Sequence, residues 1–145
     1  MRNDAKIERL ASIPLFAGSR PRELEQVARL CTEVDVPSGR ALCREGETGQ
    51  EFFVIEDGTV AVSVGGKEVA TLGAGDFFGE LALLDAGPRN ATVTAQTDVR
   101  VLVVSRQEFM GLLEQEPVVA VRMLPAIGAR LRAGVAPAQE QPPVV

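Results

Sequence analysis

The residue types that indicate chemistry gather in one short segment, residues 79–93. Gly79 allows a close approach of the backbone to a ligand, and residues 80–84 fit one helical turn whose first amides have no partner within the helix. Helix starts of this kind favour anions, and Arg89 would bring a planar pair of donors to the same anion. Glu80 would repel a phosphate, so its useful role is to accept a hydrogen bond from a sugar hydroxyl. Together these residues predict a site for a phosphate joined to a ribose.

Other kinds of chemistry are made improbable by what the chain lacks. It contains no histidine, so the usual metal ligand and the usual neutral-pH base are missing, and Ser-His or Cys-His nucleophiles are impossible. Cys31 and Cys43 form neither a CxxC motif nor a disulfide framework, and we interpret both as reduced, packed thiols. We therefore expect no catalytic residue, no metal ligand and no resident cofactor, and a chain that is not an enzyme.

Charge and hydropathy limit the partners. The 15 basic and 20 acidic residues give a net charge of −5, which argues against direct nucleic-acid binding because backbone phosphates require a clustered basic face. No apolar run approaches the roughly 18 residues of a membrane span, and the first residues lack the apolar core of a secretory signal. We expect a cytoplasmic protein. Its 145 residues suit one domain.

The elements around the site segment fall into zones. We expect a domain over 1–134, made of a helical entry (1–31), a β-rich middle (32–105) and C-terminal helices (106–134), followed by a flexible tail (135–145). In the middle zone, short runs with a period of two alternate with glycine-rich turns. The strands are expected at 32–36, 40–43, 51–55, 59–64, 67–72, 91–95 and 99–105. The predicted fold is mainly β with flanking α: an antiparallel β-roll, or jelly-roll-like barrel, between N-terminal and C-terminal helices.

Particular residues indicate where turns and helices lie. Gly65-Gly66 predicts a two-residue hairpin, because primed turns need positive φ, and Asp57-Gly58 predicts a second tight turn. Pro21 opens a helix to about residue 30 that Ser19 or Arg20 caps.

The C-terminal helices are also indicated by capping residues. Ser105 and Glu108 fit a capping box at the start of one helix. A further helix after residue 116 is expected to kink or break at Pro125, which removes a backbone donor, and to end near Gly134.

A longer ordered set of residues extends the pattern beyond the site segment. The set comprises Gly39, Glu45-Gly46-Glu47, Phe53-Val54-Ile55, Gly58, Gly75-Asp76, the string FGELALL at 78–84, the string PRNATV at 88–93, and Arg106-Gln107-Glu108-Phe109. In type and order it resembles cyclic-nucleotide-binding domains, the family of the catabolite activator protein, the regulatory subunits of cyclic-AMP-dependent kinase and nucleotide-gated channels. The two strings resemble the family's phosphate-binding cassette. The resemblance covers roughly residues 13 to 132.

This resemblance implies a role for each residue of the segment. The main-chain amides of Gly79, Leu81 and Ala82 would bind the cyclic phosphate. Arg89 would pair with its exocyclic oxygens, and Glu80 would accept from the ribose 2′-hydroxyl.

It also implies which residues contact the base. Asn90 would lie beside the phosphate and within reach of the purine. The base pocket would be lined by Val62, Val69 and Ala70. A residue of the final helix would cap the base, with Arg130, Leu131 and Val135 as the candidates.

Two positions depart from the family pattern. Gln50 stands where many members have an aspartate that helps to hold the cassette arginine, and it supplies no charge. Asn90 replaces the usual Ala, Ser or Thr, which leaves the choice between cyclic AMP and cyclic GMP open. Neither change removes a ligand of the phosphate.

The resemblance implies a non-catalytic sensor of cyclic AMP first, and of cyclic GMP second, whose C-terminal helices rearrange to act on an effector protein that the sequence does not identify. One alternative is a ligand-free protein-interaction domain, but relatives that have lost binding typically lose the arginine or the glutamate, and both are present. Another is the N-terminal sensor fragment of a larger regulator of the catabolite-activator type. No helix-turn-helix follows Gly134 and the acidic balance is wrong for DNA, so this alternative requires that the chain is a fragment.

Overall fold

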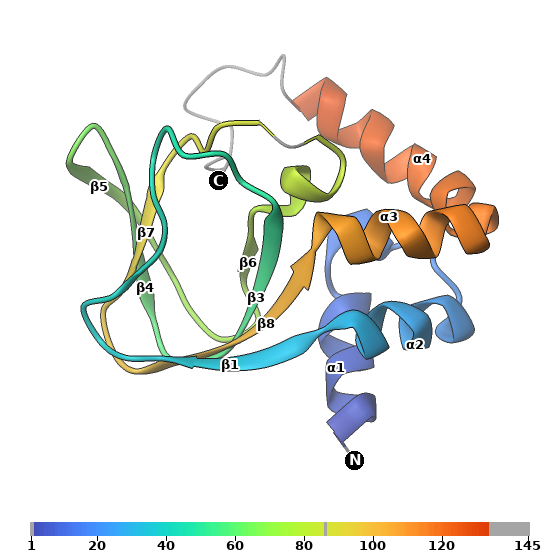
Figure 1. Ribbon diagram of the computed structural model, residues 1–145, viewed down its shortest axis with the longest axis horizontal. Helices are drawn as coiled ribbons and strands as arrows, with labels where there is room; N and C mark the ends of the chain where they lie inside the picture. The colour runs from blue at the N-terminus through green and yellow to red at the C-terminus, as the bar shows by residue number, and fades with distance from the viewer. Residues whose placement is uncertain (1, 86, 134–145) are drawn as a thin grey trace. The chain divides into compact units, whose positions relative to one another are not determined.

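The computed structural model describes residues 2–85 and 87–133, which form two compact units (Figure 1). The helical unit contains residues up to Leu30 and from Phe109 onward, and the β unit contains Cys31–Glu108. No helix among the described residues has both the length and the apolar character needed to cross a membrane.

The described residues of the β unit form two four-stranded antiparallel sheets. One sheet has the order β1 (Thr32–Val36), β8 (Val99–Ser105), β3 (Glu51–Asp57), β6 (Phe77–Phe78). The other has the order β2 (Ala41–Cys43), β7 (Thr92–Ala95), β4 (Val60–Val64), β5 (Lys67–Leu72). Buried apolar side chains of both sheets share one core, among them Phe53, Ile55, Val62, Val93 and Val101. The predicted antiparallel β-roll is confirmed.

One strand was not predicted. Strand β6 contains only Phe77 and Phe78, and it pairs with Val54 and Phe53 of β3. Two adjacent phenylalanines show no period, so the sequence predicts only that they are buried. The strand matters for the site because it ends directly before Gly79.

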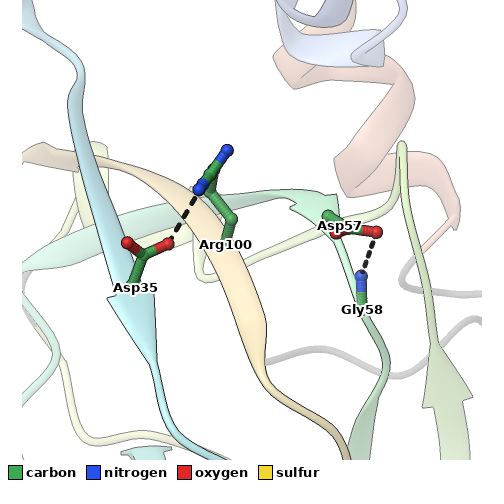
Figure 2. A network of polar contacts seen from close by, with 4 residues as sticks. All are labelled: Asp35, Asp57, Gly58 and Arg100. Carbon is green, nitrogen blue, oxygen red and sulfur yellow. Dashed lines mark hydrogen bonds and ion pairs between the residues drawn. The ribbon is translucent and has the colours of Figure 1, made fainter.

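Glycines with positive φ form the two predicted turns differently. Gly65 and Gly66 have φ of 60° and 80° and join β4 to β5, which confirms the hairpin. Gly58 has φ of 92°, and its amide donates to Oδ1 of Asp57 at 3.0 Å (Figure 2). Because β3 and β4 belong to different sheets, this second turn is a corner from one sheet to the other rather than a hairpin.

The helical unit is built from α1 (Arg2–Ala11), η1 (Pro14–Phe16), α2 (Pro21–Leu30), the later part of α3 (Arg106–Gln115) and α4 (Pro117–Ala133). Its core contains the buried side chains of Leu10, Phe16, Val27, Phe109 and Met123. The rings of Phe16 and Phe109 meet edge to face with centroids 6.1 Å apart. Such pairs stabilise beyond the area that they bury.

Helix α2 is capped by Arg20 rather than Ser19. The carbonyl of Arg20 accepts from the amides of Glu23 and Leu24, and the amide of Arg20 donates to Glu23 Oε1 at 3.0 Å. Glu23 thus reaches back to the cap as the N3 residue of a capping box does.

The sequence predicts a kink or a break at Pro125. A break is wrong, because α4 continues through this residue to Ala133, and the kink stays a prediction. Proline removes one helical hydrogen bond, and the buried side chains of Val119 and Met123 hold the preceding turns. Gly134 and the tail 135–145 lie outside the described residues. The division into a domain over 1–134 and a tail stays a prediction.

Candidate functional site

The first half of the site segment is a short turn that follows β6. Gly79 has φ of 79°, a left-handed conformation that glycine adopts readily. Residues Glu80–Leu83 then form the 3-10 helix η2, as the sequence predicts. The amide of Ala82 donates to the Gly79 carbonyl at 3.0 Å, so a ligand would have to share this amide with the turn. The binding of phosphate by the amides of Gly79 and Leu81 stays a prediction.

The second half of the segment is fixed to the neighbouring loop by main-chain hydrogen bonds. The amide of Arg89 donates to the carbonyl of Glu47 at 2.8 Å, and the Gly46 amide donates to the Arg89 carbonyl at 2.9 Å. The Gly49 amide donates to the Gly87 carbonyl at 2.9 Å. The backbone of Arg89 is therefore held from both sides before the chain enters β7.

The side chain of Arg89 is almost fully enclosed, with 8% of the residue exposed. Its Nη2 donates to the main-chain carbonyl of Glu51 at 2.7 Å, and its Cζ lies 5.8 Å from the centroid of the Phe53 ring. Gly79 is its neighbour, because a Cβ at this position would lie 2.5 Å from Nη1. The structure thus brings the arginine to the start of the η2 turn.

The side-chain hydrogen bond of this guanidinium goes to a main-chain carbonyl, which is a neutral partner. Its field reaches Cys43, where burial raises the pKa of the thiol and the positive charge of Arg89 works in the opposite direction. An enclosed cation is costly unless a negative charge compensates it. The arrangement is therefore suited to holding a small anion.

Glu80 is the second buried charged residue of the segment, at 8% exposure. Buried carboxylates are usually paired or hydrogen-bonded. Its predicted role as an acceptor for a ribose hydroxyl stays a prediction.

The residues predicted to contact the base lie in different surroundings. Val62 is fully buried, and its register partner on β5 is the half-buried Ala70. Val69 is 51% exposed and lies at the irregularity of the β4–β5 ladder, while Asn90 is exposed. Val135 and the side chains of Arg130 and Leu131 lie outside the described residues. The lining and capping of a base by these residues stay predictions.

Sequence reasoning missed the groups that hold Arg89. The family pattern directs attention to Gln50, whose side chain is exposed and whose carbonyl accepts from the amide of Arg106 at 2.8 Å. The structure points instead to Gly49 and to the carbonyl of Glu51. In the sequence, Gly46 and Gly49 both resemble turn glycines, but of the two only Gly46 has a positive φ.

Comparison with known proteins identifies the class. The model of the cyclic nucleotide-binding domain matches residues 33–116, and the chain belongs to this family. The family's domain is a regulatory module and not a catalytic one, in agreement with the composition.

Relatives of known sequence or structure agree with this class. A cyclic nucleotide-gated potassium channel of Rhizobium etli is 39% identical over 111 residues, which are 77% of this chain and 31% of the channel. The N-terminal domain of a transcriptional regulator from Streptomyces coelicolor superposes with a TM-score of 0.79 at 32% identity, covering 86% of this chain and 90% of that one. The regulatory domain of Toxoplasma gondii PKA, crystallised with cAMP, gives a TM-score of 0.70 at 30% identity, covering 89% and 50%.

Proposed function

We propose that this chain is a cyclic-nucleotide sensor that binds cyclic AMP in preference to cyclic GMP and transmits binding to an effector protein. The observation that carries the proposal is the enclosed guanidinium of Arg89, which is held by a carbonyl rather than by a carboxylate. A cyclic phosphate would supply the missing negative charge through paired hydrogen bonds. The likeness to a PKA regulatory domain crystallised with cAMP supports this choice of ligand, and the buried Cys31 and Cys43, which form no disulfide among the described residues, fit a cytoplasmic setting.

Within this proposal each residue has one task. Arg89 pairs with the exocyclic oxygens, the amides of the η2 turn bind the phosphate, and Glu80 accepts from the ribose 2′-hydroxyl. None of these groups forms or breaks a covalent bond, so the ligand leaves unchanged. Specificity for a ribose phosphate comes from the simultaneous use of both charges.

The test is a calorimetric titration of the parent and of Arg89→Ala with each cyclic nucleotide. We expect saturable binding by the parent, stronger for cyclic AMP, and a loss of at least about 100-fold in the variant, because a charge-assisted, two-point contact is removed. Arg100→Ala is the matched control, since it removes an exposed arginine of the same β unit. Undiminished binding by Arg89→Ala would contradict the proposal.

A separate measurement tests the sugar contact. Glu80→Gln keeps the size of the side chain but weakens its acceptor strength for a hydroxyl. We expect the variant to bind cyclic AMP and its 2′-deoxy analogue with similar affinity, whereas the parent discriminates between them. If discrimination is retained in the variant, the role of Glu80 is different.

The output of the sensor would be a shift in population between two arrangements of the C-terminal helices. A ligand produces such a shift only by binding the two arrangements unequally. Hydrogen exchange with and without cyclic AMP should therefore change in α3 and α4 as well as in residues 79–93. Protection confined to the site segment would argue against transmission through these helices.

A second candidate is the sensor portion of a larger regulator. It is favoured by the coverage, since this chain matches 90% of an N-terminal domain that is itself part of a transcriptional regulator. Reading the gene beyond both ends of the printed sequence decides this point. A longer frame with a DNA-binding motif would support the candidate, and stop codons on both sides would exclude it.

A further inference from the structure

Gly49 is a glycine that turn geometry does not explain. The glycines with a left-handed backbone include its loop neighbour Gly46 (φ of 85°), but Gly49 is not among them. The backbone at Gly49 therefore has a conformation that alanine can adopt. Gly49 is nevertheless buried, so its missing side chain must be explained by what surrounds it.

The space beside Gly49 is occupied by the Arg89 side chain. A Cβ on Gly49 would collide with Nε and would lie 2.6 Å from Cζ and 2.7 Å from Cδ. The nearest atoms all belong to this one side chain, and none to the backbone. An alanine at position 49 would thus have to displace the guanidinium.

The guanidinium has little room to move away from position 49. A Cβ at Gly79 would lie 2.5 Å from Nη1 and 2.8 Å from the Glu51 carbonyl oxygen. Nη2 is already bound to this oxygen at 2.7 Å, and Phe53 lies close by. Arg89 is therefore enclosed between two glycines, in a slot whose polar partner is the main chain.

We propose that Gly49 is a positioning residue for Arg89, and that the main chain of residues 49–51, rather than the side chain at position 50, aims the guanidinium at the ligand. This inference rests on the proposed function, in which Arg89 binds the phosphate. It explains how the site does without an acidic residue at Gln50. The slot fixes the plane of the guanidinium, and misplacing such a group weakens the paired hydrogen bonds that it makes.

The first test measures binding of cyclic AMP. We expect Gly49→Ala to weaken binding by about 10- to 100-fold, as expected for the loss of a hydrogen bond to a charged group. Gln50→Ala should stay within about twofold of the parent. Gly73→Ala is the matched control, because its Cβ would meet neighbours only at 3.9 Å. Parent-like binding by Gly49→Ala, or a large loss in Gln50→Ala, would overturn the inference.

The second test needs no ligand and separates positioning from a general structural role. Gly49→Ala should lower the urea midpoint in the parent but leave it unchanged or raise it in Arg89→Ala, where the slot is empty and alanine restricts the unfolded chain. Gly73→Ala should have the same effect in both backgrounds. Equal destabilisation by Gly49→Ala in both backgrounds would show that the glycine serves the fold and not the arginine.

The two tests fail in distinguishable ways. If the parent binds no cyclic nucleotide, the proposed function fails. The urea midpoints of the single and double variants at positions 49 and 89 still show whether Gly49 makes room for the Arg89 side chain. If binding depends on Arg89 but not on Gly49, the proposed function stands and the positioning role is rejected.

Discussion

Two arginines, one in each unit, are held by different kinds of partner. In the helical unit, Nε of Arg122 donates to Glu23 Oε2 at 2.7 Å, and Glu23 is 6% exposed. In the β unit, Nη2 of Arg89 donates to the main-chain carbonyl of Glu51, also at 2.7 Å. The distances are equal, but one partner is a charge and the other a neutral dipole.

The difference shows that the partner determines what a buried arginine does. A carboxylate offsets the charge of Arg122, and the pair links α2 to α4. The carbonyl that holds Arg89 is a neutral dipole, and in the proposed function the charge of Arg89 meets an anion. The predictions that follow test this division between a structural and a binding arginine.

The largest expected effect comes from breaking the neutralised pair. Arg122→Ala leaves Glu23 buried without its counter-charge, and we expect the free energy of unfolding to fall by about 3 kcal/mol. Cyclic AMP affinity should stay close to that of the parent. Urea denaturation and calorimetry measure the two quantities. Arg29→Ala is the control, because it breaks an exposed pair with Glu25 in α2. If Arg122→Ala lost affinity without losing stability, the division would be wrong.

The acid side of the stability profile sharpens the same comparison. Burial raises the pKa of Glu23, but hydrogen bonds from the Arg20 amide and from Arg122 outweigh it and lower the pKa below its ordinary 4.5. A group with a lowered pKa stabilises the fold fully above its unfolded value and loses this contribution as pH falls through the folded value. The difference in free energy of unfolding between the parent and Glu23→Gln should therefore be largest above pH 4.5. It should shrink as the pH falls below this value. A difference that stays constant down to pH 3 would contradict this account.

The two arginine sites also differ in how far the sequence predicts them. The string around Arg89 is contiguous and marks the residue directly. Glu23 and Arg122 are 99 residues apart, and no local pattern connects them. The slot of Arg89 was missed for a related reason, since only tertiary structure distinguishes Gly49 from the turn glycine Gly46.

The fold was more predictable than the contacts. Period-two runs and paired glycines such as Gly65-Gly66 predict the β-roll, because each is a local preference of the backbone. Strand β6 and the unbroken α4 depend on partners elsewhere, which override local signals. Proline at 125 is a strong local signal, and packing of Val119 and Met123 still keeps the helix continuous.

A smaller effect is expected at the start of α3. Ser105 Oγ accepts from the Glu108 amide at 3.2 Å and donates to the Glu108 carboxylate at 2.8 Å. The two residues thus serve as hydrogen-bond partners for each other, as Glu23 and Arg122 do. Ser105→Ala should lower the free energy of unfolding by about 1 kcal/mol. Ser105→Thr, which keeps the hydroxyl, should recover most of the loss. No recovery would mean that the cap is not the cause.

The smallest effect is expected where an arginine is neutralised but exposed. Nε of Arg100 on β8 lies 3.0 Å from Oδ1 of Asp35 on β1 (Figure 2), and the two side chains are 53% and 78% exposed. Hydrogen bonding and the charge of Asp35 raise the pKa of Arg100, but water screens such pairs and their side chains lose entropy on pairing. We expect Arg100→Ala to leave the urea midpoint within error of the parent, with any residual loss disappearing in about 1 M salt. Arg100 and Arg122 both face a carboxylate but differ in burial. If Arg100→Ala lowered the free energy of unfolding as much as Arg122→Ala does, pairing alone, and not burial, would explain the stabilisation by the Glu23–Arg122 pair.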